Sequence, residues 1–450
     1  MSTPADSNTE PEGGQGQGPT HLGVAGNLAR SFIHSPLTPL LLVAMLSIGI
    51  LGLLITPRQE DPQIEVPMVD VFVQYPGASS KQVSSLVAEP LQRILGEITG
   101  VKHVYAASWR GQAIVTVEFH VGQDMEDSLV KLYDKIESNM DKIPPGVSKP
   151  LVKPKSVDDV PIVTLTLWSA EVDDATLKLV AEEVLQRLHE VPNTSKGFIV
   201  SGREEQVRIE PLPDKLKGYG ISLSQLAQTI RTANTERAAG SMEYQGAAME
   251  LYTGSFLRTK DEIERLVVTV RNGRPVYVRD VARVYWGPSE TKKLVQFYTG
   301  PAYPEHVNAN GLPAVTIAIA KKKGSNGVTV ADAVLERMAF LKGRVVPDNV
   351  HVDVTRNYGK TARDKVNELV LKLFVATGAV AVLVLLFLGL RAALVVTVVI
   401  PVVILITVFS AWVLGYTIDR VSLFALIFSI GILVDDAIVV VENIYRRWLL

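Results

Sequence analysis

The chain has 450 residues, of which 47% are hydrophobic, and its 45 basic and 47 acidic side chains leave a formal net charge of −2. This length is enough for two or three domains, and the balanced charge gives no global attraction to nucleic acid. The chain has no cysteine, which excludes disulfides and thiolate metal sites.

Residues 1–20 are rich in Ser, Gly, Gln, Glu and Pro, which predicts a disordered cytoplasmic tail. No cleavage site follows the first apolar stretch, so we expect an uncleaved membrane anchor there. Four apolar stretches are long enough to be transmembrane helices. They are residues 37–56, 369–390, 392–416 and 421–445.

Basic residues predict the orientation of these spans. Arg30, Arg391, Arg446 and Arg447 fall on one side of the bilayer if all four stretches cross it. The positive-inside rule makes that side cytoplasmic. The region between the first two spans is therefore expected to be exported.

The first part of the exported region, residues 57–150, alternates strand and helix patterns. The order strand, helix, strand, strand, helix is typical of a ferredoxin-like split βαβ unit. The predicted elements are a strand at Val69–Tyr75, a helix at Ala78–Ile98, strands at Val101–Trp109 and Ala113–Phe119, and a helix at Met125–Ile143.

A second unit of this kind is predicted from two separated segments, residues 151–201 and 291–360, with an insertion at residues 202–290. Within the insertion, Thr235–Gly254 suggests a long hairpin. The charged run Lys321–Lys323 is interpreted as a solvated strand end. The other predicted elements are strands at Ile162–Trp168, Gln206–Glu210, Val267–Arg271, Pro275–Val278, Ala314–Ala320 and His351–Thr355, and helices at Asp174–His189, Ser222–Ala233 and Val328–Phe340.

Asp435 and Asp436 interrupt the last apolar stretch, roughly 20 Å along a helix from Arg420. A carboxylate at this depth costs a few kcal/mol or more, so it marks an ion or proton pathway by default. Repulsion between two neighbouring carboxylates favours uptake of a proton. The alternative is a structural pair neutralised by a basic residue. No lysine or arginine lies inside residues 37–56, 373–390 or 392–416, so such a partner would come from outside these stretches.

Other residues of the last two spans have open interpretations. Glu442 and Asn443 lie two turns beyond the aspartates and fit either a polar track or solvation of the helix end. Pro401 fits a hinge or a packing kink, and Gly431 fits close helix approach.

The exported region has no GxSxG motif, no ATP-binding loop and no zinc spacing. We therefore predict no catalytic residues, no metal site and no cofactor, and not an enzyme. The coupling ion would be the proton.

These motifs resemble the resistance–nodulation–division (RND) efflux permeases, most closely their hydrophobic/amphiphilic multidrug, AcrB-like branch. The fourth-span signature GILVDDAIVVVENIYRR at Gly431–Arg447 is highly specific for the family. Further similar segments are FLGLRAALVVTVVIPVVIL at Phe387–Leu405, VQYPGASSKQV at Val73–Val83, IPPGV at Ile143–Val147 and NTERAAGSMEYQG at Asn234–Gly246.

The resemblance implies an α+β membrane protein with four transmembrane helices, two periplasmic porter subdomains (residues 57–150, and 151–201 with 291–360) and an inserted docking subdomain (residues 202–290). It implies a multi-pass pump of the bacterial inner membrane, driven by proton influx through Asp435 and Asp436. The implied partners are membrane lipid, two further copies in a homotrimer, a periplasmic adaptor and an outer-membrane channel.

The chain departs from this family in two ways. Family members have twelve spans in two similar halves, so this chain corresponds to an N-terminal half and lacks the lysine that faces the aspartates. It would then be a fragment, a truncated product or one piece of a split pump. The acidic segment RQEDPQI (Arg58–Ile64) leaves the substrate class open. The alternatives are a SecD/SecF-like protein-export accessory and a non-transporting scaffold.

Overall fold

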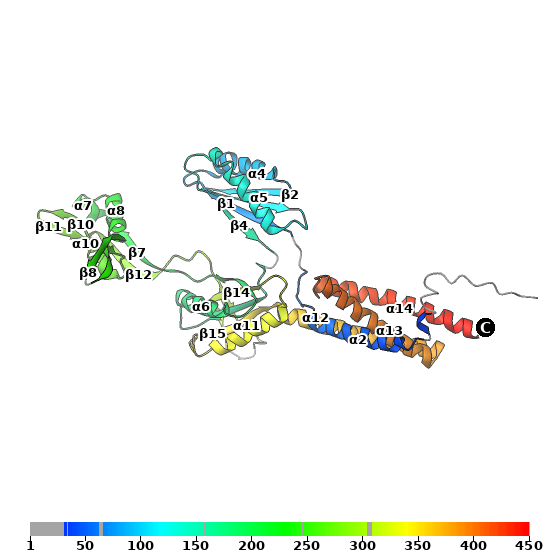
Figure 1. Ribbon diagram of the computed structural model, residues 1–450. Coiled ribbons are helices and arrows are strands. Elements are labelled where there is room, and N and C mark those ends of the chain that lie inside the picture. Colours follow the sequence, from blue (N-terminus) through cyan, green and yellow to red (C-terminus); the bar gives the residue numbers. More distant parts are fainter. Residues whose placement is uncertain are drawn as a thin grey trace, which may run out of the picture. The chain divides into compact units, whose positions relative to one another are not determined.

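The computed structural model describes residues 31–449 except residues 34, 63–65, 157–158, 245 and 304–307. The predicted N-terminal tail therefore lies outside the described residues. The chain divides into two compact units. Figure 1 labels their helices and strands. The helical unit consists of the segments before Gln63 and after Thr361, and the sheet unit is Gln63–Thr361.

Among the described residues, four helices are long and apolar enough to cross a membrane. They are α2 (Leu37–Ile55), α12 (Tyr358–Leu388), α13 (Leu390–Val413) and α14 (Arg420–Leu449). Each predicted span overlaps one of them. However, α12 begins before its predicted span at residue 369, because charged residues that favour helix precede the apolar stretch.

A larger share of α13 is buried than of the other three helices. Its side chains Val396, Ile400 and Ile404 form one core cluster with residues of α12 and α14. Gly389 alone separates α12 from α13, and its φ of 89° is a conformation that favours glycine. The two helices therefore reverse direction at a single residue.

Two glycines bring α2 against α13. Gly49 and Gly52 are the buried residues of α2. A Cβ atom at Gly49 would lie 2.5 Å from the Cβ of Leu405, and one at Gly52 would lie 2.7 Å from the Cα of Phe409. The two backbones thus approach so closely that only glycine fits at these positions.

The first part of the sheet unit is a four-stranded antiparallel sheet with strand order β2-β3-β1-β4. Side chains Val71, Val115 and Val117 on one face of this sheet pack against Leu95 and Leu132 of its helices. The elements are β1 (Met68–Gln74), α3 (Ser80–Val83), η1 (Ser84–Ala88), α4 (Glu89–Gly96), β2 (Val101–Trp109), β3 (Gln112–Phe119), α5 (Met125–Glu137), η2 (Met140–Lys142) and β4 (Leu151–Lys155).

A second antiparallel sheet has the order β13-β14-β5-β15, and β6 also pairs with β14. Helices α6 and α11 contribute Leu177, Val184 and Val334 to the core beneath it. The elements are β5 (Val163–Trp168), α6 (Asp174–Leu188), β6 (Thr194–Val200), β13 (Gln296–Tyr298), β14 (Asn310–Lys321), α11 (Gly327–Leu341) and β15 (His351–Asn357).

The segment between β6 and β13 has its own core, which includes Leu226, Val268 and Val276. The predicted hairpin is present as the antiparallel pair β8 and β9, and its described residues are almost all exposed. The elements are β7 (Glu205–Pro211), α7 (Pro213–Tyr219), α8 (Leu223–Ala233), β8 (Thr235–Tyr244), β9 (Ala247–Ser255), α9 (Lys260–Glu264), β10 (Val267–Arg271), β11 (Arg274–Tyr277), α10 (Val278–Val281) and β12 (Ala282–Pro288).

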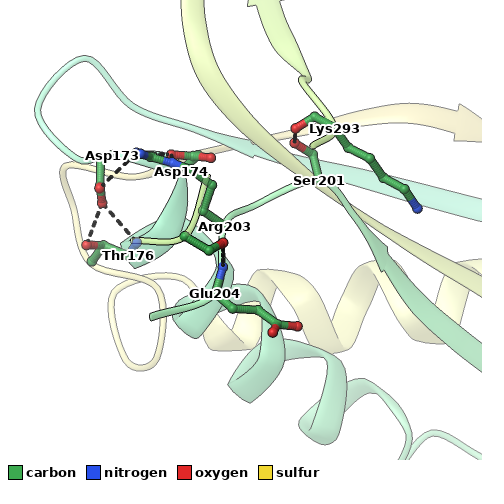
Figure 2. Close-up of polar contacts among 8 residues, drawn as sticks. Asp173, Asp174, Thr176, Ser201, Arg203, Glu204 and Lys293 are labelled. Atoms are coloured by element: carbon green, nitrogen blue, oxygen red, sulfur yellow. Dashed lines mark hydrogen bonds and ion pairs between the residues drawn. The ribbon is translucent and has the colours of Figure 1, made fainter. Parts of the chain in front are cut away.

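The two connections to this inserted segment are tied together at the start of α6. Figure 2 shows Arg203 beside Asp173 and Asp174, and its Nε donates to Asp174 Oδ1 at 2.7 Å. Ser201 Oγ donates to the carbonyl of Lys293 in the returning connection at 3.2 Å. The insertion is therefore anchored through both of its ends.

One interpretation of the sheet unit is wrong. Lys321 is 5% exposed at the end of β14, so only Lys322 and Lys323 of the charged run are solvated. The backbone carbonyl of Lys321 accepts a hydrogen bond from Ser195 Oγ of β6 at 2.8 Å. The strand continues one residue further than its apolar alternation indicated, because β6 pairs with it there.

Candidate functional site

Asp435 and Asp436 lie in the interior of α14. The start of this helix is fixed by Asp419, whose Oδ1 accepts the backbone N–H of Ser422 at 2.8 Å. The helix is continuous from Arg420, so Asp435 lies roughly 20 Å along its axis. Both carboxylates are therefore far from the polar start of the helix.

The two aspartates lie on the side of α14 that does not pack against α12 and α13. Leu433, Ile438 and Val441 pack against the core cluster of those helices. At about 100° per residue, Asp435 and Asp436 project roughly opposite to these three side chains. Both aspartates are exposed, and neither forms an ion pair with a residue that the structure describes.

Glu442 and Asn443 share this side of α14. Each lies seven positions after one aspartate, which returns it to nearly the same direction around the helix. Both are exposed. We call Asp435, Asp436, Glu442 and Asn443 the polar stripe of α14. None of the described helices covers this stripe, and the described residues include no cluster suited to a metal ion.

A second polar cluster, the α2–α14 junction, joins residues 57–61 to residues 417–420. Gln59 Nε2 donates to Thr417 Oγ1 at 2.8 Å, and the Thr417 hydroxyl donates to Asp419 Oδ2 at 3.3 Å. All three side chains are buried. This chain of hydrogen bonds links the end of α2 to the cap of α14.

Backbone contacts strengthen the junction. The N–H of Gln59 donates to the carbonyl of Ile418 at 3.0 Å, and the N–H of Ile418 donates to the carbonyl of Pro57 at 2.9 Å. Asp61 forms an ion pair with Arg420 at 3.2 Å. The sequence did not reveal this cluster, since its two segments are distant along the chain.

The model of the AcrB/AcrD/AcrF family matches residues 28–449 of this sequence. The chain belongs to the AcrB/AcrD/AcrF family. The predicted resemblance to RND efflux permeases is therefore confirmed.

Relatives of this AcrB/AcrD/AcrF family member include multidrug resistance protein MdtC of Edwardsiella ictaluri, at 29% identity, and of Pantoea ananatis, at 30% identity. Each alignment extends over 420 residues and covers 92% of this chain but 40% of the relative. The chain thus spans about 40% of the length of these relatives.

The two predicted hinge or packing positions lie in different surroundings. Pro401 lies within α13, which continues on both sides of it, and is half-buried. Because proline has no N–H, it cannot donate to the carbonyl of Thr397. Gly431 is exposed, and a Cβ atom there would meet nothing within 4 Å. Any helix that approaches α14 at Gly431 must come from outside the described residues.

The acidic residues of the segment Arg58–Ile64 have partners in the structure. Asp61 pairs with Arg420, and the backbone carbonyl of Glu60 accepts the N–H of Arg420 at 3.2 Å. These residues therefore take part in the α2–α14 junction. Residues 63 and 64 of the segment lie outside the described residues.

We expect Glu60→Gln to stabilise the helical unit slightly at neutral pH. Burial raises the pKa of Glu60, and the charge of Asp61 adds to this, whereas Arg420 and Lys365 lower it. A carboxyl group with a raised folded pKa binds its proton more tightly in the folded state, so stability rises as the pH falls through that pKa and is lost as the pH rises. The gain at neutral pH should be below about 1 kcal/mol, because Glu60 is partly solvated.

The thermal midpoint of the detergent-solubilised chain, measured from about pH 5 to about pH 8, checks this expectation. Glu60→Gln should flatten the curve. Asp61→Asn is the matched control, since it removes an ion-paired carboxylate and should not stabilise. Identical curves for the parent and Glu60→Gln would contradict the assignment.

Proposed function

We propose that this chain is the N-terminal half of a proton-driven efflux transporter that exports small amphiphilic compounds from the periplasm or the inner-membrane leaflet. The observation that carries the proposal is the polar stripe of α14, with Asp435 and Asp436 inside an apolar helix and on its unpacked side. Carboxylates at this depth are costly and are kept for function. Family membership and the multidrug resistance relatives support efflux of such compounds.

Proton uptake would remove charge from Asp435 or Asp436 and lower the cost of placing that face in an apolar environment. Proton release would restore the charge and favour a state in which the stripe meets water or a cation. The two states differ in their affinity for protons, so a proton gradient can shift their populations. Glu442 and Asn443 would continue the proton path, and Pro401 would allow α13 to bend.

The stripe needs a partner that covers it in the membrane. The described residues supply none, and the relatives are more than twice as long, because the 420 aligned residues are 40% of the relative. We assign the cover to the C-terminal half of the pump, which would also supply the cation that faces the carboxylates.

In this proposal the sheet unit lies in the periplasm. Residues 57–150, and 151–201 with 291–360, would form two ferredoxin-like porter subdomains, and residues 202–290 a docking subdomain. The strand order β2-β3-β1-β4 supports the first assignment. The exposed hairpin of β8 and β9 would insert into a neighbouring subunit of a homotrimer, and the assembly would join a periplasmic adaptor and an outer-membrane channel.

The decisive experiment is dye efflux from cells that lack their own pumps. The chain is expressed alone and together with a polypeptide that supplies the remaining length of its relatives. We expect efflux only in the second case, and we expect a protonophore to abolish it. The family match does not favour the alternative of a protein-export accessory. Secretion of a periplasmic marker protein, measured in the same cells, tests that alternative directly.

Membrane insertion and oligomer size serve as controls for both expression conditions. Efflux that persists after the proton gradient is collapsed would contradict proton coupling. Absence of efflux from the complete, inserted assembly would contradict the transport function itself.

A further inference from the structure

Three segments of the helical unit meet at the α2–α14 junction. Residues 57–61 follow α2 and lead towards β1, and α14 begins directly after Asp419. Helix α12 begins directly after β15, and its Val366 and Leu369 pack in one core cluster with Leu423 at the start of α14. Both chain segments that connect the helical unit to the sheet unit therefore contact the start of the helix that carries the aspartates.

The junction is a rigid contact rather than a solvated one. The side chains of Gln59, Thr417 and Asp419 are 6%, 7% and 6% exposed. Thr417 accepts from Gln59 and donates to Asp419, and Asp419 also holds the first backbone N–H groups of α14. Water does not compete for these bonds, so a displacement of α14 at this end moves residues 57–61 with it.

The tether from the junction to the sheet unit is short. Six residues lie between Asp61 and Met68, the first residue of β1, so this connection spans at most about 25 Å when extended. This length limits how far residues 57–61 can move without displacing β1.

We propose that the α2–α14 junction is the contact that couples α14 to the exported part of the pump, with Thr417 as its central positioning residue. This inference rests on the proposed proton relay in the polar stripe. Gln59 and Asp419 hold Thr417 from two sides, so protonation of the stripe moves α14 and residues 57–61 together. Without the Thr417 hydroxyl, the aspartates still bind protons, but proton binding no longer drives transport.

The test compares two substitutions of Thr417 in the co-expressed, complete pump. Thr417→Val keeps the size of the side chain but removes the hydroxyl, and we expect dye efflux to fall by about tenfold, the effect of losing a buried hydrogen bond. Thr417→Ser keeps the hydroxyl and should retain efflux. A hydrophobic carbodiimide should label the protonated aspartates equally in both variants. A general folding defect would instead change the labelling.

A reversible crosslink tests the same contact within one folded protein. The chain has no cysteine, so the pair Gln59→Cys and Thr417→Cys introduces the only thiols of this chain. We expect the reduced pair to transport poorly and the oxidised pair to recover efflux, because a disulfide replaces the lost hydrogen bond. An oxidised pair that stays inactive would show that the junction has to open, and it would overturn the inference.

Full efflux in Thr417→Val would also overturn it. Failure of the underlying relay gives a different result, in which Asp436→Asn leaves efflux of the otherwise unchanged pump at the parent rate. The two failures are therefore distinguishable.

Discussion

Asp436→Asn is expected to reduce proton-coupled dye efflux of the complete pump to the background of cells without it, a loss of about a hundredfold or more. Asparagine matches aspartate in size and keeps its hydrogen-bonding oxygen, but it cannot take up or release a proton in this range. Asp436 lies on the unpacked side of α14, so the substitution removes no contact that the described residues make. Insertion and folding should therefore be unaffected.

The same stripe provides the matched control. Glu442 lies on the same side of α14 but close to its end, and Glu442→Gln removes a carboxylate in the same way. Because the inner pair binds the proton and Glu442 only continues the path to the helix end, Glu442→Gln should reduce efflux less than Asp435→Asn. Efflux at the parent rate in the inserted Asp436→Asn pump would refute the relay assignment. Equal losses at all three positions would extend the relay along the whole stripe.

The sequence predicted much of the fold because its strongest patterns are local. Period-two alternation marked β1, and helical spacing marked the segment from Ser80 to Gly96. The four spans followed from hydropathy alone, since no soluble core helix needs such long apolar stretches.

Elements that depend on tertiary pairing were not predicted. Strand β4, LVKPK, contains Pro154 and two lysines, and it is stable only as the edge strand beside β1. The strands β6 and β12 were missed for a similar reason, because each is defined by a partner far along the chain. Strand β13 was missed because its 3 residues are too few to show an alternation.

For the candidate site too, the sequence predicted some features and not others. The position of Asp435 and Asp436 was evident from the sequence, because charges inside an apolar run are conspicuous. Which neighbours that side of α14 meets depends on the packing of Leu433, Ile438 and Val441, and the spacing of the polar residues does not indicate it. The α2–α14 junction, like β4, was not predicted because it forms between segments that are distant along the chain.

Gly52→Leu is expected to separate α2 from α13 and to destabilise the helical unit by about 3 kcal/mol, the upper range for overpacking a tight contact. The Cβ atom would lie 2.7 Å from both Cα and Cβ of Phe409 and 3.0 Å from its backbone nitrogen. Two of these atoms are backbone atoms, so no rotamer of the new side chain relieves the clash. The thermal midpoint of the solubilised chain and its resistance to protease measure the loss.

Gly378→Leu is the matched control, because Gly378 lies inside α12 and a Cβ atom there would meet nothing within 4 Å. It should be neutral or slightly stabilising, since glycine costs about 1 kcal/mol relative to alanine in a helix interior. Gly49 and Gly52 are the buried residues of α2, and Leu53 adds only a partly buried contact, so the rest of that helix compensates little for Gly52→Leu. An unchanged midpoint would show that α2 is held by something other than its contact with α13.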